Sequence, residues 1–335
     1  MHFVRFVVKV VCVSLVAPTL DDVREARPRV YGVMQPSPML RHPLLEEWLG
    51  CEAWIKHENH NPTGAFKIRG GLNLLAQLSP DDRRRGVISA STGNHGQSIA
   101  FASRLHGVRC RIVVPVGNNP EKNAAMRGFG AEVREVGRDY DECVEIAARL
   151  AAERGLVVAH STNDARIIAG AATMAAEVVE QAEQLDAMVV SVGGGSQAVG
   201  ALVASRARRP GLAVYAVQAA GASAIHDAWH AGRPVHHDRC DTFADGLATR
   251  STYAMTFPAL RDGLADFLTV GEAAIAEAVR MLLRTTHHLA EGAGAAGLAG
   301  LLARRERLAG RTVAIVLSGA NIDEPTLRRV LNREI

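Results

Sequence analysis

Residues 61–71 read NPTGAFKIRGG and place a single lysine, Lys67, between Phe66 and Ile68, after a Pro-Thr-Gly turn and before a pair of glycines. A lysine in water is a cation with a pKa of about 10.4 and is a poor nucleophile. Burial beside apolar groups lowers that pKa and leaves the amine able to form a Schiff base with an aldehyde. Lys67 is therefore either a solvated residue at a helix start or a nitrogen held in a pocket for chemistry, and the rest of the chain decides between the two.

The composition is that of a globular protein large enough for two compact units. The 335 residues are 48% hydrophobic and 22% charged, and 38 basic residues interspersed with 35 acidic ones give a net charge of +3. No basic block occurs, so we expect no nucleic-acid partner. The five cysteines are scattered and form no C-x-x-C pair. This pattern argues against a disulfide framework or a cysteine zinc site and indicates a cytoplasmic protein.

Residues 1–18 form an apolar extension whose purpose the sequence leaves open. Arg5 and Lys9 precede an apolar run from Val10 to Ala17, which has the shape of a secretory signal. The run is shorter than the roughly 20 residues that a membrane-spanning helix needs, so we expect no membrane anchor. The alternatives are an extra strand or a misplaced start of the chain.

Short apolar runs alternate with stretches of helical periodicity along the whole chain. This alternation is typical of βαβ units and predicts an α/β protein with mostly parallel sheets. The strand candidates are 86–90, 110–116, 131–136, 156–159, 188–192, 214–218 and 312–318, and the helix candidates are 97–105, 121–129, 140–153, 171–184, 272–288 and 294–308.

Three of the predicted strands run directly into small or polar residues. The sequences after them are STGNHG (91–96), GGGS (193–196) and GAN (319–321). Ligands of open parallel sheets bind at the carboxyl ends of the strands. We therefore expect these three segments to contribute to one composite site.

The segment after strand 188–192 has the character of a phosphate-binding turn. Gly193, Gly194 and Gly195 allow the backbone to approach an anion closely, Ser196 adds a hydroxyl, and the N-terminus of a following helix favours negative charge. The segment matches neither the P-loop pattern nor a regular dinucleotide fingerprint. The alternative interpretation is a tight strand-to-helix turn.

The segment STGNHG offers a nest of backbone N–H groups with the side chains of Ser91, Thr92 and Asn94, which suits a carboxylate. His95 has no partners at ligand spacing, so we expect it to pack rather than to catalyse. A third polar group, Ser318, ends a predicted buried strand and can hydrogen-bond a pyridine nitrogen without requiring its protonation. A lysine, a phosphate cradle and a ring partner together describe a pyridoxal phosphate (PLP) site.

Five motifs then occur in the order found in the fold-type II PLP-dependent enzymes: NPTGAFKIRGG, STGNHGQS, GGGSQAVG, EGAGAAGLAG and LSGANID. The chain resembles this tryptophan synthase β-like family from about Thr19 to Asp323. Within it the chain is most similar to threonine/serine dehydratases (ammonia-lyases), with serine racemase as a near relative. The resemblance implies two open, twisted, mostly parallel-sheet domains: a large PLP-binding domain from 19–85 and 163–335, and a small mobile domain from 86–162.

The resemblance also implies roles for individual residues. Lys67 would hold the cofactor as a Schiff base and carry the substrate proton. The other implied cofactor contacts are Phe66 on the ring face, Asn94 on the ring oxygen, Gly193, Gly194, Gly195 and Ser196 on the phosphate, and Ser318 on the ring nitrogen. The implied substrate contacts are Ser91, Thr92 and His95.

Several positions depart from the family pattern. Ser196 replaces a fourth glycine and Ala320 replaces a glycine after Ser318, and both changes are compatible with cofactor binding. Thr92 stands where the racemases carry a serine base, which argues against racemisation. Gln218 and Ala224 replace the carboxylates of the metal-binding members, so we expect no divalent cation there and assign no metal ligands. The chain ends soon after LSGANID, which leaves no room for a regulatory domain and favours a catabolic role.

The predicted function is PLP-dependent elimination of water from a β-hydroxy amino acid such as L-threonine or L-serine, giving a 2-oxo acid and ammonia. Racemisation, β-replacement and dehydration of another substrate such as 3-hydroxyaspartate are the alternatives on the same scaffold, and a silent PLP-binding protein is a third. Arg250 is either a carboxylate partner for an acidic substrate or a surface residue. Family kinship implies a homo-oligomer, either a dimer or a tetramer.

Overall fold

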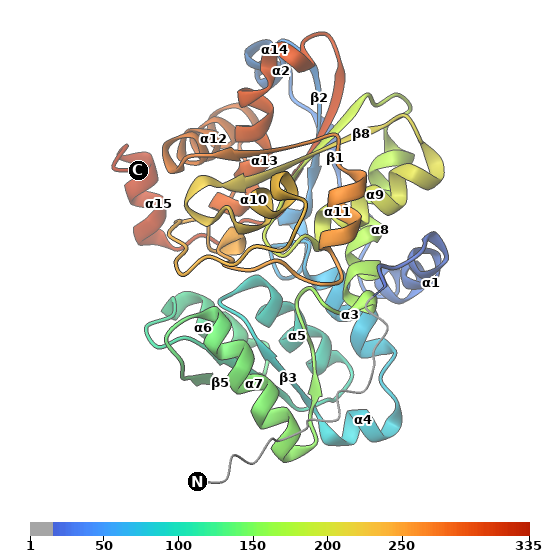
Figure 1. The fold of residues 1–335 in the computed structure, drawn as a ribbon, viewed down its shortest axis with the longest axis vertical. Coiled ribbons are helices and arrows are strands. Elements are labelled where there is room, and N and C mark those ends of the chain that lie inside the picture. The colour runs from blue at the N-terminus through green and yellow to red at the C-terminus, as the bar shows by residue number, and fades with distance from the viewer. Residues whose placement is uncertain (1–15) are drawn as a thin grey trace.

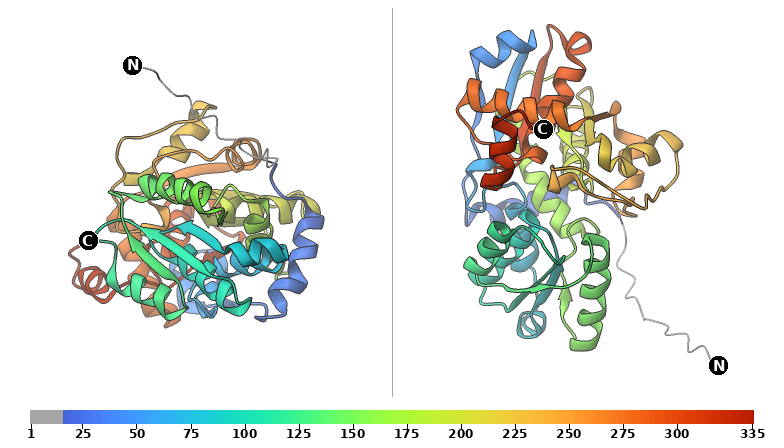
Figure 2. Two further views of the ribbon diagram at one scale, coloured as in Figure 1. Left: turned by 90° about the horizontal axis from the view of Figure 1, so that it is seen from below. Right: turned by 90° about the vertical axis from the view of Figure 1, so that its left-hand side faces the viewer.

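The computed structural model describes residues 16–335, so most of the predicted N-terminal extension (1–18) lies outside the described residues. Two β-sheets, each covered by helices, form two parts stacked along the longest axis of the molecule (Figures 1 and 2). All strand pairs are parallel except that of β1 with β2. The predicted α/β class with mostly parallel sheets is therefore confirmed. Among residues 16–335, no helix combines the length and the apolar character that crossing a bilayer requires.

The larger sheet has six strands in the order β1-β2-β10-β7-β8-β9. Its strands are β1 (Met39–Arg41), β2 (Glu52–His57), β7 (Ala187–Ser191), β8 (Ala213–Ala219), β9 (Asp266–Val270) and β10 (Thr312–Leu317).

Both faces of this sheet are buried because successive side chains of each strand point to opposite sides. Val189 and Ile315 pack under one helical layer, whereas Val190 and Val316 pack under the other. The first layer contains α2 (Pro43–Leu49), α12 (Glu272–Thr286), α13 (Gly292–Ala303), α14 (Arg305–Leu308) and α15 (Glu324–Leu331). The second contains α1 (Leu20–Tyr31), α8 (Ala165–Gln181), α9 (Ser196–Arg208), α10 (Ala224–Ala231) and α11 (Phe257–Gly263).

The smaller sheet has four parallel strands in the order β5-β4-β3-β6. They are β3 (Val87–Ala90), β4 (Cys110–Val114), β5 (Glu132–Glu135) and β6 (Val157–Val158). One face packs on α3 (Ile68–Ala76), α5 (Asn94–Leu105) and α6 (Pro120–Gly128), and the other on α7 (Tyr140–Arg154), while α4 (Pro80–Arg85) lies on the surface. The four strands of this sheet lie within residues 86–162, and the division into a large and a small mobile domain stays a prediction.

A buried group of charges, the Arg69 cluster, anchors the start of α3 to the larger sheet. It consists of Lys56, Glu58, Arg69 and Glu177, whose side chains are 0–2% exposed. Arg69 binds both carboxylates, with Nε 2.7 Å from an oxygen of Glu58 and Nη1 2.5 Å from an oxygen of Glu177. Because two cations meet two anions with many hydrogen bonds, burial of these charges is tolerated. The cluster fixes the position of the turn that carries Lys67, two residues before Arg69.

Candidate active site

A cavity lies between the two sheets, where strands β3, β7 and β10 end, and it encloses about 880 Å³ of empty space including its open mouth. Its wall includes every residue to which the family resemblance gave a cofactor or substrate contact. These are Phe66, Lys67, Ser91, Thr92, Asn94, His95, Gly193, Gly194, Gly195, Ser196 and Ser318. The three strand ends therefore form one composite cavity, as the parallel topology predicts.

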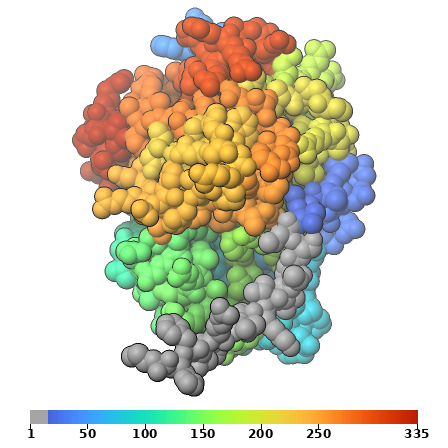
Figure 3. Space-filling model, in the orientation of Figure 1, coloured from blue at the N-terminus to red at the C-terminus, as the bar shows by residue number. Residues whose placement is uncertain are grey.

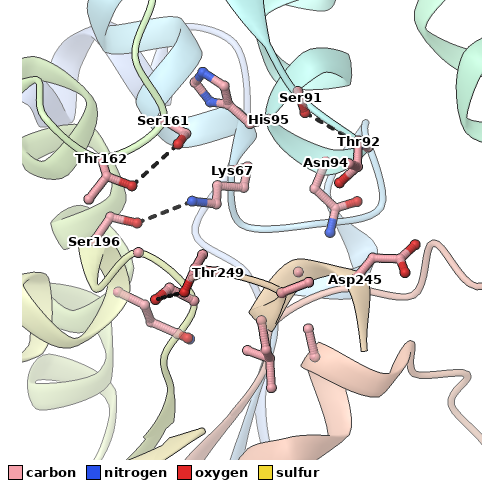
Figure 4. Close-up of a pocket in the computed structure, with 18 of the residues that line it drawn as sticks. Lys67, Ser91, Thr92, Asn94, His95, Ser161, Thr162, Ser196, Asp245 and Thr249 are labelled. Carbon is pink, nitrogen blue, oxygen red and sulfur yellow. Dashed lines mark hydrogen bonds between the residues drawn. The ribbon is translucent and has the colours of Figure 1, made fainter. Parts of the chain in front are cut away.

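Lys67 is the N-cap residue of α3 and its side chain crosses the cavity toward Ser196 (Figure 4). Its Nζ donates a hydrogen bond of 3.2 Å to Oγ of Ser196 and lies 5.1 Å from the centre of the Phe66 ring. Among the described residues, no carboxylate forms an ion pair with Lys67. Burial without such a partner lowers the pKa of this amine from 10.5 to about 8. At neutral pH a useful fraction of Lys67 is therefore the neutral nucleophile.

The glycine turn after β7 presents its backbone to the cavity at the N-terminus of α9. Gly195 has a φ of 98°, in the left-handed region that favours glycine. A Cβ on Gly194 would lie only 2.1 Å from Oγ1 of Thr162, so no larger residue fits there. Thr256 Oγ1 donates to the Gly194 carbonyl at 2.8 Å, which keeps this carbonyl engaged. The N–H groups that begin α9 have no acceptor within the helix and suit an anion such as a phosphate.

A second set of backbone donors lies at the start of α5. Ser91 Oγ accepts hydrogen bonds from the N–H groups of Gly93 at 3.1 Å and Gly96 at 2.8 Å, and so orders this turn. The N–H groups of Asn94 and His95 remain for an acceptor outside the helix. Figure 4 shows Ser91, Thr92 and Asn94 across the cavity from Ser196, with Lys67 between them. This arrangement suits a substrate carboxylate.

His95 is buried and neutral. Its Nε2 lies 3.0 Å from the carbonyl oxygen of Ala159, and since a carbonyl can only accept, Nε2 carries the proton. Burial, together with the nearby Lys67, lowers the pKa of His95 to about 3. His95 therefore contributes a wall and a fixed dipole to the cavity, and no positive charge.

Asn94 is held by two side chains from the opposite part of the molecule. Its Nδ2 donates to Oε1 of Glu291 at 2.5 Å, and its Oδ1 accepts from Nδ2 of Asn321 at 2.7 Å. An amide nitrogen has two donor hydrogens, so one remains for a ligand. Ser318, at the end of β10, makes only a long contact of 3.4 Å from Oγ to the carbonyl of Ala293, which leaves its hydroxyl available to a ligand. Both side chains line the cavity and keep a donor hydrogen that a ligand can use.

Several cavity residues were not nominated from the sequence. They are Lys122, Tyr140, Thr162, Asp245, Tyr253 and Glu291. Glu291 belongs to the EGAGAAGLAG motif, and burial raises the pKa of this carboxyl to about 6. Lys122 pairs with Asp245, with Nζ 2.6 Å from Oδ2. Glu291 had a sequence signal, because its motif was recognised without a role for its acid.

Arg250 lies outside the cavity wall. Its guanidinium binds Asp139 at 3.1 Å and Asp141 at 2.9 Å, at the N-terminus of α7. In the space-filling view the segment that carries Arg250 sits directly above α7 (Figure 3). Arg250 therefore does not face the substrate, and it is more than a surface residue. It ties the segment that carries it to α7, the helix on the outer face of the small sheet.

Gln218, which replaces a carboxylate of the metal-binding members, accepts a hydrogen bond from the backbone of His226 at 3.0 Å.

These features can be compared with what PLP would need. The cavity combines an amine with a lowered pKa, a glycine turn in which a Cβ at residue 194 would clash with Thr162, a hydroxyl at 318 and an amide at 94. Phe66 supplies an apolar surface for the ring. The residues present therefore fit PLP in size and in donor chemistry.

A family comparison supports the same conclusion. The family described as pyridoxal-phosphate-dependent enzyme matches residues 30–319. The chain belongs to this family. Its fold-type II architecture and its dependence on PLP, both predicted from the sequence, are thereby confirmed, whereas the roles of individual residues stay predictions.

Three relatives illustrate the reactions found on this scaffold. An L-threonine ammonia-lyase of Thermotoga maritima is 36% identical over 94% of this chain and 78% of the relative. An L-threo-3-hydroxyaspartate ammonia-lyase of Saccharomyces cerevisiae is 34% identical over 92% of this chain and 95% of the relative. The structure of maize serine racemase superposes with a TM-score of 0.88 at 27% identity, covering 95% of this chain and 98% of that one.

Proposed function

We propose that the protein is a PLP-dependent ammonia-lyase that eliminates water from L-threonine or L-serine. L-Threonine would give 2-oxobutanoate and ammonia, and L-serine would give pyruvate and ammonia. The hydroxyl leaves as water and one water later displaces the amine, so the net change is loss of ammonia. The observation that carries this proposal is the amine of Lys67, which is buried without a carboxylate partner in a cavity that also holds an anion cradle. The ammonia-lyases among the relatives support the reaction class.

PLP, when bound, withdraws electrons from the Cα of the amino acid and so makes its proton removable. The residues that would hold it are Lys67, the turn 193–196, Asn94, Ser318 and Phe66. Lys67 Nζ then accepts the Cα proton, since a pKa of about 8 leaves part of the amine unprotonated at neutral pH. The N–H groups at the start of α5 would fix the substrate carboxylate, which points the Cα–H bond toward Lys67.

The charges of the cavity favour a substrate with a neutral side chain. Of the described residues that line it, only Lys67 and Lys122 are lysines or arginines, and Lys122 is paired with Asp245. Burial lowers the pKa of His160 to about 4 and that of His95 to about 3, so neither offers a positive charge at neutral pH. A second carboxylate, as in 3-hydroxyaspartate, would therefore lack a cation of its own, and its desolvation would not be compensated.

A substrate panel tests the proposal. The purified holoenzyme is incubated with L-threonine, L-serine, D-serine and L-threo-3-hydroxyaspartate, and 2-oxo acid and substrate chirality are measured. We expect kcat/KM for L-threonine or L-serine to exceed that for 3-hydroxyaspartate at least about tenfold, which is 1.4 kcal/mol of discrimination. Preference for 3-hydroxyaspartate would refute the substrate assignment, and inversion without 2-oxo acid would identify a racemase.

A homo-oligomer, dimer or tetramer, in the cytoplasm is part of the same proposal. Leu40, Leu44 and Trp48 are 43%, 56% and 60% exposed around β1 and α2, and such apolar side chains suit a contact between subunits. The cysteines Cys51, Cys110, Cys143 and Cys240 are unpaired, as expected in a reducing compartment. Light scattering coupled to size exclusion gives the subunit number, and a monomeric mass at micromolar concentration would contradict the oligomer.

A further inference from the structure

Three histidines from separate segments meet in the helical layer formed by α2, α12 and α13. His42 is the N-cap residue of α2, His57 is the last residue of β2, and His288 follows the end of α12. One ring nitrogen of each lies within 4.8 Å of the others, and we call these three residues the imidazole cluster. Figure 1 shows α2, β2 and α12 in the part of the molecule built on the six-stranded sheet. None of the three histidines lines the PLP cavity.

The spacing within the imidazole cluster matches metal ligation. Nε2 of His42 lies 3.2 Å from Nε2 of His57, and the ring centres of His57 and His288 are 4.3 Å apart. Two imidazoles on a tetrahedral zinc ion, each about 2.0–2.1 Å from it, have nitrogen atoms roughly 3.4 Å apart. The His42–His57 pair is thus already at the length of a tetrahedral edge.

A cluster of neutral, hydrogen-bonded rings explains these residues less well. His57 is 0% exposed, and Nδ1 of His57 and Nδ1 of His288 are buried without a hydrogen-bond partner among the described residues. Buried polar atoms are nearly always satisfied, so the orphaned Nδ1 of His288 suggests a missing ligand; Nδ1 of His57 would stay outside the coordination of an ion bound at Nε2.

We propose that His42, His57 and His288 bind a divalent transition metal of the zinc class, with solvent in the fourth position. Imidazole ligands suit zinc, cobalt, nickel and copper, whereas magnesium and calcium prefer oxygen ligands. His60 is exposed and its ring centre is 5.1 Å from that of His288, so the cluster reaches solvent on this side. The sequence-based expectation of no metal ligands did not consider these residues, since no spacing motif connects them.

The ion would have a structural role beside the PLP cavity. His57 pairs with Leu317 in the larger sheet, and Ser318 follows Leu317 directly. His288 lies three residues before Glu291, which holds Asn94. A metal on the imidazole cluster would therefore tie together the segments that carry two cavity residues without touching the substrate.

Zinc binding to the chelator-treated holoenzyme tests this site. ZnCl₂ is titrated in a non-coordinating buffer by calorimetry, bound metal is counted after dialysis, and CoCl₂ is added to a second sample to record the visible spectrum. We expect one zinc per chain, intense visible bands of tetrahedral cobalt, and a higher Tm with zinc. His42→Gln, His57→Gln and His288→Gln should each weaken zinc binding by at least about 100-fold. His106→Gln is the matched control and should change nothing, because His106 lies at the end of α5 away from the cluster.

The outcomes are decisive in both directions. Zinc binding with unchanged affinity in His42→Gln and His288→Gln, two partly exposed positions that tolerate substitution more readily than His57, would overturn the site. Octahedral cobalt spectra, or equal binding of MgCl₂ with the same sensitivity to these variants, would overturn the assignment to the zinc class. Loss of binding in His60→Gln would overturn solvent as the fourth ligand.

Discussion

Lys56 is fully buried and Lys67 is half-buried in the cavity wall, and these two lysines of the same chain are in opposite situations. Nζ of Lys56 lies 2.6 Å from a carboxylate oxygen of Glu177 and also donates to the carbonyl of Ser37 and to Gln181. Lys67 has a single hydroxyl contact, to Ser196. Burial lowers the pKa of both amines, but at Lys56 the attraction of Glu177 opposes this effect.

The comparison shows that the partner, more than the burial, decides what a buried lysine does. At Lys56 the carboxylates of the Arg69 cluster oppose the effect of burial, and the ion pair with Glu177 joins β2 to α8. Without a carboxylate, Lys67 is held in a form that can react, and the protein is destabilised as a result. Removing the carboxylate beside Lys56, or adding one beside Lys67, should therefore make the changed lysine behave more like the other.

The largest effect is expected from Lys67→Met. Activity should fall by ~10³-fold or more because the base and the covalent attachment point are lost. The PLP-free variant should nevertheless be more stable than the PLP-free parent. Folding lowers the pKa of Lys67 from 10.5 to about 8. Above pH 10.5 the amine is neutral in both the folded and the unfolded state, so this group does not lower the parent's free energy of unfolding. As the pH falls from 10.5 through 8, stability is lost because the unfolded state binds the proton more tightly.

At pH 7 the stability gain of Lys67→Met should be at most about 3 kcal/mol, and it should shrink toward pH 10.5. Urea unfolding at several pH values measures it, and borohydride reduction of the parent holoenzyme checks that the cofactor is fixed on Lys67. A variant less stable than the parent at pH 7 would contradict the comparison.

Glu177→Gln should have the opposite effect to Lys67→Met. The free energy of unfolding should fall, and the catalysed reaction should be little affected directly. It leaves Lys56 and Arg69 with one carboxylate, Glu58, and breaking buried ion pairs of this kind destabilises by about 3–5 kcal/mol. Urea unfolding of the variant is compared with that of Glu153→Gln, an exposed position on α7. If both variants unfold at the same urea concentration, the Arg69 cluster is not what anchors α3.

Ser196→Asp gives Lys67 the kind of partner that Lys56 has. A carboxylate beside Nζ should raise the pKa of Lys67 and repel an anion from the glycine turn, so kcat/KM should fall about 100-fold and its acidic limb, where the base loses its proton, should move to higher pH. Ser196→Ala, which removes the hydroxyl alone, should lose less than about tenfold. Equal losses in the two variants would mean that the hydroxyl, not the absence of charge, matters at this position.

The smallest effect is expected at Glu291, the buried acid that holds Asn94. Burial raises its pKa from 4.5 to about 6, so the stability this group contributes is complete below pH 4.5 and is lost as the pH rises through 6. Glu291→Gln lacks this loss and should exceed the parent in stability by up to about 2 kcal/mol at pH 8, but not at pH 4. Thermal melts at both pH values decide, and a difference independent of pH would show that folding does not raise the pKa of Glu291.

The sequence predicted the parts of the fold that carry a clear period. The apolar runs at 110–116, 188–192 and 312–318 are β4, β7 and β10, and the helix expected at 140–153 is α7. By contrast, β2 was not among the strand candidates, because Glu52, Lys56 and His57 hide its apolar pattern. The helix expected over 294–308 is divided, since α13 ends at Ala303 and α14 begins at Arg305.

Prediction of the cavity from the sequence was limited in the same way. The cavity residues that the sequence predicted lie in short motifs, and each motif has its own physical reason for binding a ligand. Glu291 and Asn94 are 197 positions apart, and the partners of Lys122 and Arg250 are equally unmarked in the sequence. Pairings of this kind arise only once two sheets meet, so no local pattern contains them.

Gly194 lies where the two parts of the molecule pack closely against each other. Its missing side chain leaves room for Thr162, which lies at the edge of the part built on the four-stranded sheet. An added methyl group at residue 194 would collide with Thr162 and push this residue away from the glycine turn. The close approach of the two parts of the molecule at this point therefore depends on the absence of a side chain at residue 194.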